Sequence, residues 1–209
     1  MSRDRVAIVD LGLGNLHSVA KAFERAGAAP TITSDPDAFV HADRLVFPGQ
    51  GAFKECADKL RGEPGEAIES WIASGRPYLG ICLGMQALFE SSEEAPGRPG
   101  LGLFEGRVVR FPKTLQDAQG HRLKVPHMGW NQIRSSHPVF EDGQWYYFVH
   151  SYHCVPADPT LVVASCDYGE PFCAAIARDN ILACQFHPEK SQHAGARLIQ
   201  RFLGDATWS

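Results

Sequence analysis

The sequence predicts an α/β fold: a mostly parallel open sheet with helices on both faces, plus a smaller mixed or antiparallel strand addition in the second half. Two observations lead to this prediction. Up to residue 91, short β-branched runs alternate with segments at helical spacing, and glycine loops follow several of the runs. After residue 91, short strand-like segments dominate, and no linker is long enough to separate two cores. We therefore expect a single domain over residues 1–209.

The first half is expected to alternate strands with helices. The strands are expected at 6–10, 28–33, 44–47 and 78–81, and the helices at 16–26, at 54–74 with a break near 62–65, and at 83–91. The first strand ends in Gly12-Leu-Gly14-Asn15, and the helix that follows is ended by Gly27. A dinucleotide-binding fingerprint would need a third glycine where the chain has His17. This loop is therefore expected to be a tight turn.

The second half is expected to consist of short strands and one final helix. The strands are expected at 106–111, 129–134, 144–152, 161–166, 173–178 and 181–186, and the helix at 194–203. Asp179-Asn180 between the last two strands is typical of a two-residue hairpin turn.

Composition excludes several classes of partner. The net charge is −4 and the pI is near 6.1, and no run of lysine and arginine could neutralise phosphates, so we expect neither nucleic acid nor membrane among the partners. No stretch reaches the ~18 apolar residues of a membrane span and no signal-peptide pattern precedes the first strand, so a cytoplasmic location is expected. The six cysteines form no C-x-x-C pair and lack metal-ligand spacing with the histidines. We expect no metal and no other cofactor.

A cysteine flanked by glycines follows the strand at 78–81. Gly80-Ile-Cys82-Leu-Gly84 has the pattern of a nucleophile elbow, in which small neighbours allow a sharp strand-to-helix turn that projects the cysteine. The helix N-terminus after it would favour a thiolate and supply a backbone N–H for an oxyanion. The alternative is an ordinary buried cysteine, because so short a pattern recurs by chance.

A histidine and a glutamate at the end of the last strand complete this pattern. On an extended chain His187 and Glu189 point to the same side, with Pro188 turned away. The carboxylate would hold one ring nitrogen as N–H, and the other nitrogen would accept the thiol proton. The alternative is an ordinary strand-end histidine and a solvated carboxylate, and for either residue taken singly this alternative is favoured. Together with the elbow they predict a catalytic triad of Cys82, His187 and Glu189.

Several segments resemble a known family. The segments at 48–51 (PGQG), 80–86 (GICLGMQ) and 187–191 (HPEKS) resemble the signatures of class I glutamine amidotransferase domains. The resemblance covers essentially the whole chain. Three further segments, at 10–16, 126–131 and 148–152, resemble the glutaminase subunits of imidazole glycerol phosphate synthases from histidine biosynthesis.

The resemblance implies that the chain hydrolyses L-glutamine to L-glutamate and ammonia through a Cys82 thioester. It implies oxyanion contacts from the backbone of Gly49, Gln50, Gly51 and Leu83, and substrate contacts from Gln86, Ser151 and Tyr152. For Gln86 the alternative is a solvated amide on a helix surface. If one oxyanion N–H points away until a partner docks, the isolated chain will turn over glutamine slowly.

Ammonia as a product implies a partner, because in water near neutral pH it is mostly ammonium and cannot attack an acceptor. The chain is too short for a second synthetic domain, so we expect it to be a subunit. The resemblance implies a heterodimer with a (β/α)₈-barrel cyclase that makes imidazole glycerol phosphate and an aminoimidazole carboxamide ribotide. By family likeness the interface would include Asn15, Trp130, Asn131, Tyr147 and Lys190. For Trp130 a buried core position is an equal alternative.

Three rival functions remain open at this point. The chain could be the glutaminase subunit of another amidotransferase, for anthranilate, aminodeoxychorismate or pyridoxal phosphate synthesis. It could be a free-standing cysteine hydrolase of γ-glutamyl peptides, which would need no partner. It could also be an inactive binding module, which would form no thioester and lose nothing on the Cys82→Ala substitution.

Overall fold

The computed structural model describes residues 3–205 and 207–208; Met1, Ser2, Ala206 and Ser209 of the expected domain lie outside the described residues. The strands are β1 (Arg5–Val9), β2 (Ala29–Thr33), β3 (Arg44–Gly49), β4 (Tyr78–Cys82), β5 (Phe89–Ser92), β6 (Phe104–Arg110), β7 (His127–Arg134), β8 (Trp145–His150), β9 (Tyr152–Pro156), β10 (Val162–Asp167), β11 (Pro171–Arg178) and β12 (Ile181–Cys184). The helices are α1 (Leu16–Arg25), α2 (Phe53–Lys59), α3 (Glu63–Ala73), α4 (Leu83–Gln86) and α5 (Gln192–Gly204), with 3-10 turns η1 (Pro36–His41), η2 (Pro159–Leu161) and η3 (Pro188–Lys190).

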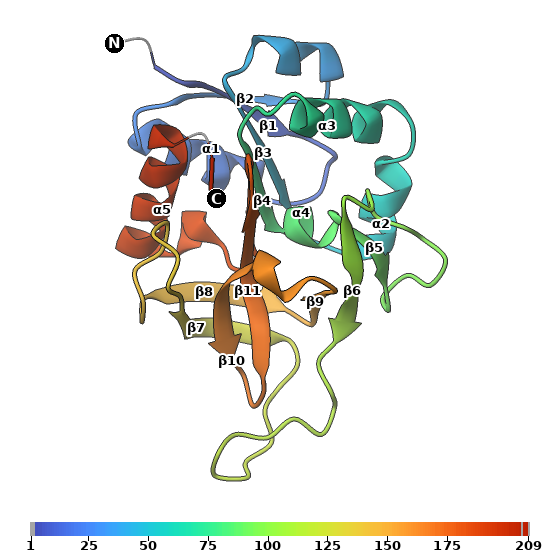
Figure 1. Ribbon diagram of the computed structural model, residues 1–209, viewed down its shortest axis with the longest axis vertical. Helices are drawn as coiled ribbons and strands as arrows, with labels where there is room; N and C mark the ends of the chain where they lie inside the picture. The colour runs from blue at the N-terminus through green and yellow to red at the C-terminus, as the bar shows by residue number, and fades with distance from the viewer. Residues whose placement is uncertain (1–2, 206, 209) are drawn as a thin grey trace.

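The main sheet has nine strands in the order β2-β1-β3-β4-β12-β11-β10-β7-β8 (Figure 1). Neighbouring strands are parallel from β2 to β12 and antiparallel from β12 to β8. A second sheet, β5-β6-β9, lies to one side. The predicted α/β class is confirmed. Most second-half strands extend the main sheet, because β12 pairs with β4 and β11 pairs with β12, so that the antiparallel strands continue the same sheet.

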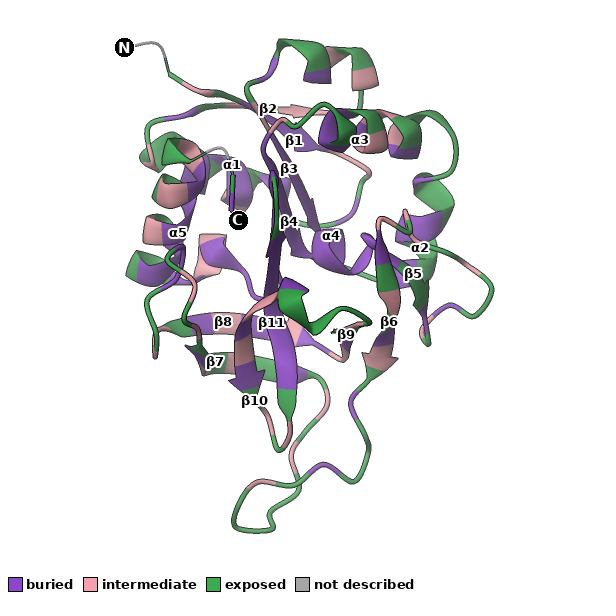
Figure 2. Cartoon of the chain, viewed as in Figure 1, coloured by how far each residue is buried: buried purple, intermediate pink, exposed green. Residues whose placement is uncertain are grey.

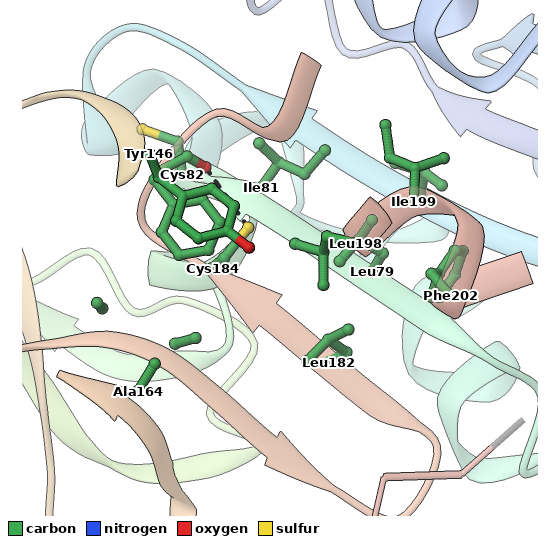
Figure 3. Packing of buried hydrophobic residues seen from close by; sticks show 14 of the residues in the cluster. Leu79, Ile81, Cys82, Tyr146, Ala164, Leu182, Cys184, Leu198, Ile199 and Phe202 are labelled. Carbon is green, nitrogen blue, oxygen red and sulfur yellow. Dashed lines mark hydrogen bonds between the residues drawn. The ribbon is translucent and has the colours of Figure 1, made fainter. Parts of the chain in front are cut away.

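Helices cover both faces of the parallel part of the sheet, as predicted. Every residue of β4 is buried, as expected for a parallel strand with both faces covered. On one face Leu79 and Ile81 share an apolar cluster with Leu198 and Phe202 of α5 (Figure 3). On the other face Tyr78 belongs to the cluster that contains the buried residues of α2 and α3. In Figure 2 the central strands are accordingly buried and the outer helix faces exposed.

The helix expected at 83–91 is wrong in length. α4 ends at Gln86, and the chain then forms β5, which runs parallel to β6. The carbonyl groups of Ala87 and Leu88 accept hydrogen bonds from Leu101 N and Phe104 N, at 2.7 Å and 3.1 Å. Pairing with a distant segment thus replaces the helical bonds, and helical spacing over so short a stretch could not reveal this.

The strand expected at 144–152 is also divided. β8 ends at His150 and joins the main sheet, whereas β9 begins at Tyr152 and joins the small sheet. Ser151 lies at the break between the two strands. The hairpin between β11 and β12 is confirmed, with Asp179 at φ +53°. No described helix is long and apolar enough to cross a membrane.

Candidate active site

Three neighbouring strands of the main sheet end at one place. In the sheet register Gly49, at the end of β3, lies beside Cys82 at the end of β4, and Ile81 lies beside Cys184 at the end of β12. His187 comes three residues after the end of β12. These strands are parallel, so their carboxyl ends meet at one edge, where open α/β sheets place their ligand sites. The fold therefore gathers the candidate oxyanion loop, the candidate nucleophile and the candidate base.

The backbone at Cys82 makes a sharp turn from strand to helix. Cys82 has φ +55° and ψ −104°, a region that side-chain-bearing residues rarely adopt. A Cβ at Gly80 would lie 2.7 Å from the carbonyl oxygen of Gly84, and a Cβ at Gly84 would lie 1.8 Å from that of Phe47. Both glycines are therefore needed for close backbone approach, as the elbow pattern predicts.

The side chains of His187 and Glu189 are joined by a hydrogen bond of 2.8 Å between Nδ1 and Oε1, and both are buried, with 2% exposed. The extended backbone expected between them is wrong, because Pro188 begins the 3-10 turn η3. Lys190 N donates to the carbonyl of His187 at 3.0 Å to close this turn. Proline favours the first position of a helical turn as readily as an extended segment, so the sequence could not distinguish the two.

The electrostatic environment of His187 favours its charged form. Burial lowers the pKa of His187, but neighbouring Cys82 and Glu189 outweigh burial and raise this pKa to about 9. Since Glu189 occupies Nδ1, the nitrogen left for proton exchange is Nε2, which has no hydrogen-bond partner among the described residues. A histidine with this pKa carries a proton at neutral pH and favours negative charge on the adjacent sulfur.

The candidate oxyanion loop is held in one particular conformation. Gln50 N donates to the carbonyl of Leu13 at 3.1 Å, so it is engaged outside the site. Gly14, at φ +116°, allows this approach, because a Cβ there would lie 3.2 Å from Gln50 N. Leu83 begins α4, and the first N–H groups of a helix have no partner within it. In this conformation Leu83 can face an oxyanion with its N–H, and Gln50 cannot.

A cleft of about 240 Å³ opens on the cysteine. Its lining includes the three expected substrate-binding residues, Gln86, Ser151 and Tyr152, together with Gln50, Cys82 and Glu94. The structure therefore brings the expected substrate residues and three of the expected oxyanion residues, Gln50, Gly51 and Leu83, around one space, whereas Gly49 does not line it.

Gln86 is buried, with 5% of its surface exposed, so the alternative of a solvated surface amide is wrong. Its Nε2 donates to the carbonyl of Tyr152 at 3.1 Å and to Gln185 Oε1 at 3.0 Å. Gln185 Nε2 in turn donates to Cys82 Sγ at 3.5 Å. Gln86 thus connects the cleft wall to the nucleophile.

Three residues at this site had no predicted role: Glu94, His150 and Gln185. Glu94 lines the cleft, and its Oε2 accepts from Phe53 N at 2.8 Å. Its segment has no regular pattern, so the sequence carried no signal for it. Gln185 was visible only as a neighbour of His187 in the chain. His150 lies within the strand expected at 144–152, and only the fold shows that it reaches the cleft.

Two of the residues expected at a partner interface form a pair on the edge of the main sheet. Trp130 of β7 lies opposite Tyr147 of β8, with ring centroids 6.2 Å apart. Trp130 is 43% exposed, so its alternative as a buried core residue is wrong. Met128, on the same strand, is 62% exposed. This edge of the sheet therefore presents apolar surface. It is connected to the site by a hydrogen bond of 2.9 Å, in which His187 N donates to the carbonyl of Tyr147.

The other three expected interface residues do not belong to this aromatic pair. Asn15 is exposed at the start of α1, where its side chain accepts from Ser18 N at 3.3 Å. Lys190 is half-buried in η3. Asn131 Nδ2 donates to the carbonyl of Asp167 at 2.7 Å, so this amide is already engaged within the chain.

Over residues 3–205 and 207–208 no three histidine, cysteine or acidic side chains are grouped closely enough to hold an ion. The described cysteines are free and buried.

Comparison with known proteins agrees with this geometry. The model of the family "Glutamine amidotransferase class-I" matches residues 7–206. A solved structure described as a glutamine amidotransferase superposes with a TM-score of 0.73 at 18% identity, covering 96% of this chain and 99% of that one. PurLQS from Thermotoga maritima also superposes with a TM-score of 0.73 at 18% identity, covering 97% of this chain and 98% of that one. At these identities the two structures show the fold.

Sequence relatives define the family more narrowly. Imidazole glycerol phosphate synthase subunit HisH of Methylococcus capsulatus is 52% identical, with 98% of both chains covered. The protein of the same name from Syntrophotalea carbinolica is 51% identical, covering 94% of this chain and 98% of its own. The chain belongs to the class I glutamine amidotransferase family and, within it, to the HisH subunits of imidazole glycerol phosphate synthase.

Proposed function

We propose that this chain is the glutaminase subunit of an imidazole glycerol phosphate synthase, which hydrolyses L-glutamine and passes the ammonia to a cyclase subunit in histidine biosynthesis. The observation that carries the proposal is the cleft that opens on Cys82, beside a histidine whose other ring nitrogen is held by Glu189. Family membership supports the choice of substrate and pathway.

The cleft suits an amino acid bound by both ends. Glu94 places a carboxylate in the lining, which would attract the α-ammonium group of glutamine. Gln86, Ser151 and Tyr152 add polar groups around the same space. The carboxamide at the far end of glutamine would then reach Cys82.

The proposed reaction has two steps. The Cys82 thiolate attacks the carboxamide carbon, and His187 gives its Nε2 proton to the departing nitrogen, so that ammonia leaves and a γ-glutamyl thioester remains. His187 then takes a proton from water, whose oxygen attacks the thioester carbon; the carbon–sulfur bond breaks, glutamate leaves, and the Cys82 thiolate and protonated His187 are restored. Glu189 keeps the ring oriented through both proton transfers.

The oxyanion loop would control the first step. Leu83 N–H can face the developing oxyanion, whereas Gln50 N–H donates to Leu13. Releasing that bond and turning the Gln50 peptide would add a donor, and one such donor typically contributes about 10²–10³-fold in kcat. We propose that docking of the cyclase breaks the hydrogen bond from Gln50 to Leu13.

We propose a heterodimer in which the partner covers the edge formed by Trp130 and Tyr147. Aromatic residues are enriched at protein interfaces, and here Trp130 is exposed while Tyr147 is half-buried beside the active-site segment. Asn15 and Lys190 would lie at the border of the same contact.

The test is glutamine hydrolysis by the purified chain with and without a (β/α)₈-barrel cyclase and its nucleotide substrate. We expect a rise of at least about 10²-fold in kcat on complex formation. Cys82→Ala should abolish turnover in the complex. Equal turnover with and without the cyclase would contradict the proposed activation, and turnover by the Cys82→Ala variant would contradict the proposed nucleophile.

A further inference from the structure

A buried glutamine, Gln185, contacts the sulfur of the proposed nucleophile. Gln185 is 0% exposed, and its backbone N donates to the carbonyl of Ala174 at 2.8 Å, which fixes the residue against β11. Its side chain spans from Gln86, 3.0 Å away, to Cys82 Sγ, 3.5 Å away. No step of the proposed reaction uses it.

The direction of these hydrogen bonds follows from one carbonyl group. The carbonyl of Tyr152 can only accept, so Gln86 must present its NH₂ group to it. That same NH₂ group lies beside Gln185, so Gln185 must present its oxygen to Gln86. The remaining NH₂ group of Gln185 therefore faces the sulfur, and a reversed amide would set two donors against each other.

We propose that Gln185 is a positioning residue that holds Cys82 Sγ and stabilises its thiolate form through this N–H···S hydrogen bond. A donor that faces an ionisable group stabilises the charged form, and it does so more strongly when water is excluded. An amide cannot take a proton from the thiol, so His187 remains the base. Gln185 also ties the sulfur to Gln86, so that nucleophile and cleft wall keep a fixed separation.

The inference rests on the proposed role of Cys82, and its test uses the full chain without glutamine. The pH midpoint of Cys82 alkylation by iodoacetamide is measured by mass spectrometry of the Cys82 peptide. Gln185→Met keeps the length of the side chain and removes the donor. We expect the midpoint to rise by about one pH unit, since hydrogen bonds to charged groups contribute on this scale.

A second variant and a matched control separate this role from a structural one. Gln185→Glu has the same shape but presents a carboxylate to the sulfur, so the midpoint should rise further than in Gln185→Met. Asn180→Leu removes another buried amide, one that donates to the carbonyls of Ile72 and Arg76, and it should leave the midpoint unchanged. Thermal unfolding of each variant reports folding.

Two results would overturn the inference. One is a folded Gln185→Met variant whose pH midpoint of Cys82 alkylation equals that of the wild type. The other is a Gln185→Glu variant whose midpoint is no higher than that of the wild type. Neither depends on glutamine turnover. A failure of the proposed function would appear separately, as activity retained by Cys82→Ala in the complex.

Discussion

Acidification from pH 7 to pH 5 should destabilise the protein through two buried histidines, His127 and His150. His150 Nδ1 lies 2.8 Å from the carbonyl of Tyr152, which can only accept, so Nδ1 carries the hydrogen. His150 Nε2 is then the acceptor for His127 Nδ1 at 3.1 Å, and His127 Nε2 accepts from Asn131 at 3.3 Å. Each ring has one donor and one acceptor in use, so this arrangement requires both rings to be neutral.

The size of the effect follows from the pKa values. Burial lowers the pKa of His127 from 6.5 to about 4, and it lowers that of His150 from 6.5 to about 3. As the pH falls below 6.5, the unfolded chain binds protons that the folded chain does not, so stability falls with pH. Between pH 7 and pH 5 each histidine accounts for about 2 kcal/mol, since one pH unit corresponds to about 1.4 kcal/mol. The pair should contribute a loss of about 4 kcal/mol.

The assay is urea unfolding of the full chain at pH 7 and pH 5, compared with the His127→Gln variant. The variant lacks one of the two titrating groups, so its loss of unfolding free energy should be smaller by about 2 kcal/mol. His187 has a raised pKa and acts with the opposite sign: its contribution is complete below pH 6.5 and is lost as the pH rises toward about 9. It is present in both proteins and cancels in the comparison. Equal losses in wild type and variant would refute the reasoning.

Three substitutions test other parts of the molecule. Glu189→Gln should lower kcat of the complex by about 10²–10⁴-fold through loss of ring orientation, and an unchanged kcat would exclude that role. Gly84→Ala sets a methyl group 1.8 Å from the carbonyl oxygen of Phe47, so urea unfolding should show a loss above about 4 kcal/mol. Gly204→Ala, with nothing within 4 Å, is its control, and equal stability of the two variants would contradict the clash. Glu94→Gln should raise KM for glutamine about 10-fold, because it removes the charge that binds the ammonium group; an unchanged KM would argue against this contact.

The sequence predicts the parallel half of the fold well because local patterns determine it. β1, β3 and β4 are short, largely buried runs with a glycine at their end or within three residues after it, and the glycines at 80 and 84 are required by contacts that the elbow pattern implies. The end of α4 was not predictable, because β5 forms through bonds to Leu101 and Phe104, which lie far along the chain. The spacing of apolar residues within one segment cannot reveal that a distant segment will pair with it.

The same contrast between local patterns and contacts with distant segments applies to the site. The sequence indicated Cys82, His187 and Glu189 as a group, since each has a recognisable neighbourhood in the chain. Gln185 and Glu94 become visible only when distant segments meet: Gln185 through Gln86, and Glu94 through the cleft. The bond from Gln50 to Leu13 is equally non-local.

The meeting of β3, β4 and β12 also determines how the site can move. These strands lie in the interior of the sheet order, so their amides should exchange with solvent only when much of the domain opens. The loop at 50–51, in contrast, is partly or fully exposed and is held by a single bond to Leu13. Hydrogen exchange should therefore separate the site into a slow scaffold that carries the cysteine and a fast loop, which we propose completes the oxyanion hole. In that proposal, docking of a partner would break one hydrogen bond and would leave the nucleophile in place.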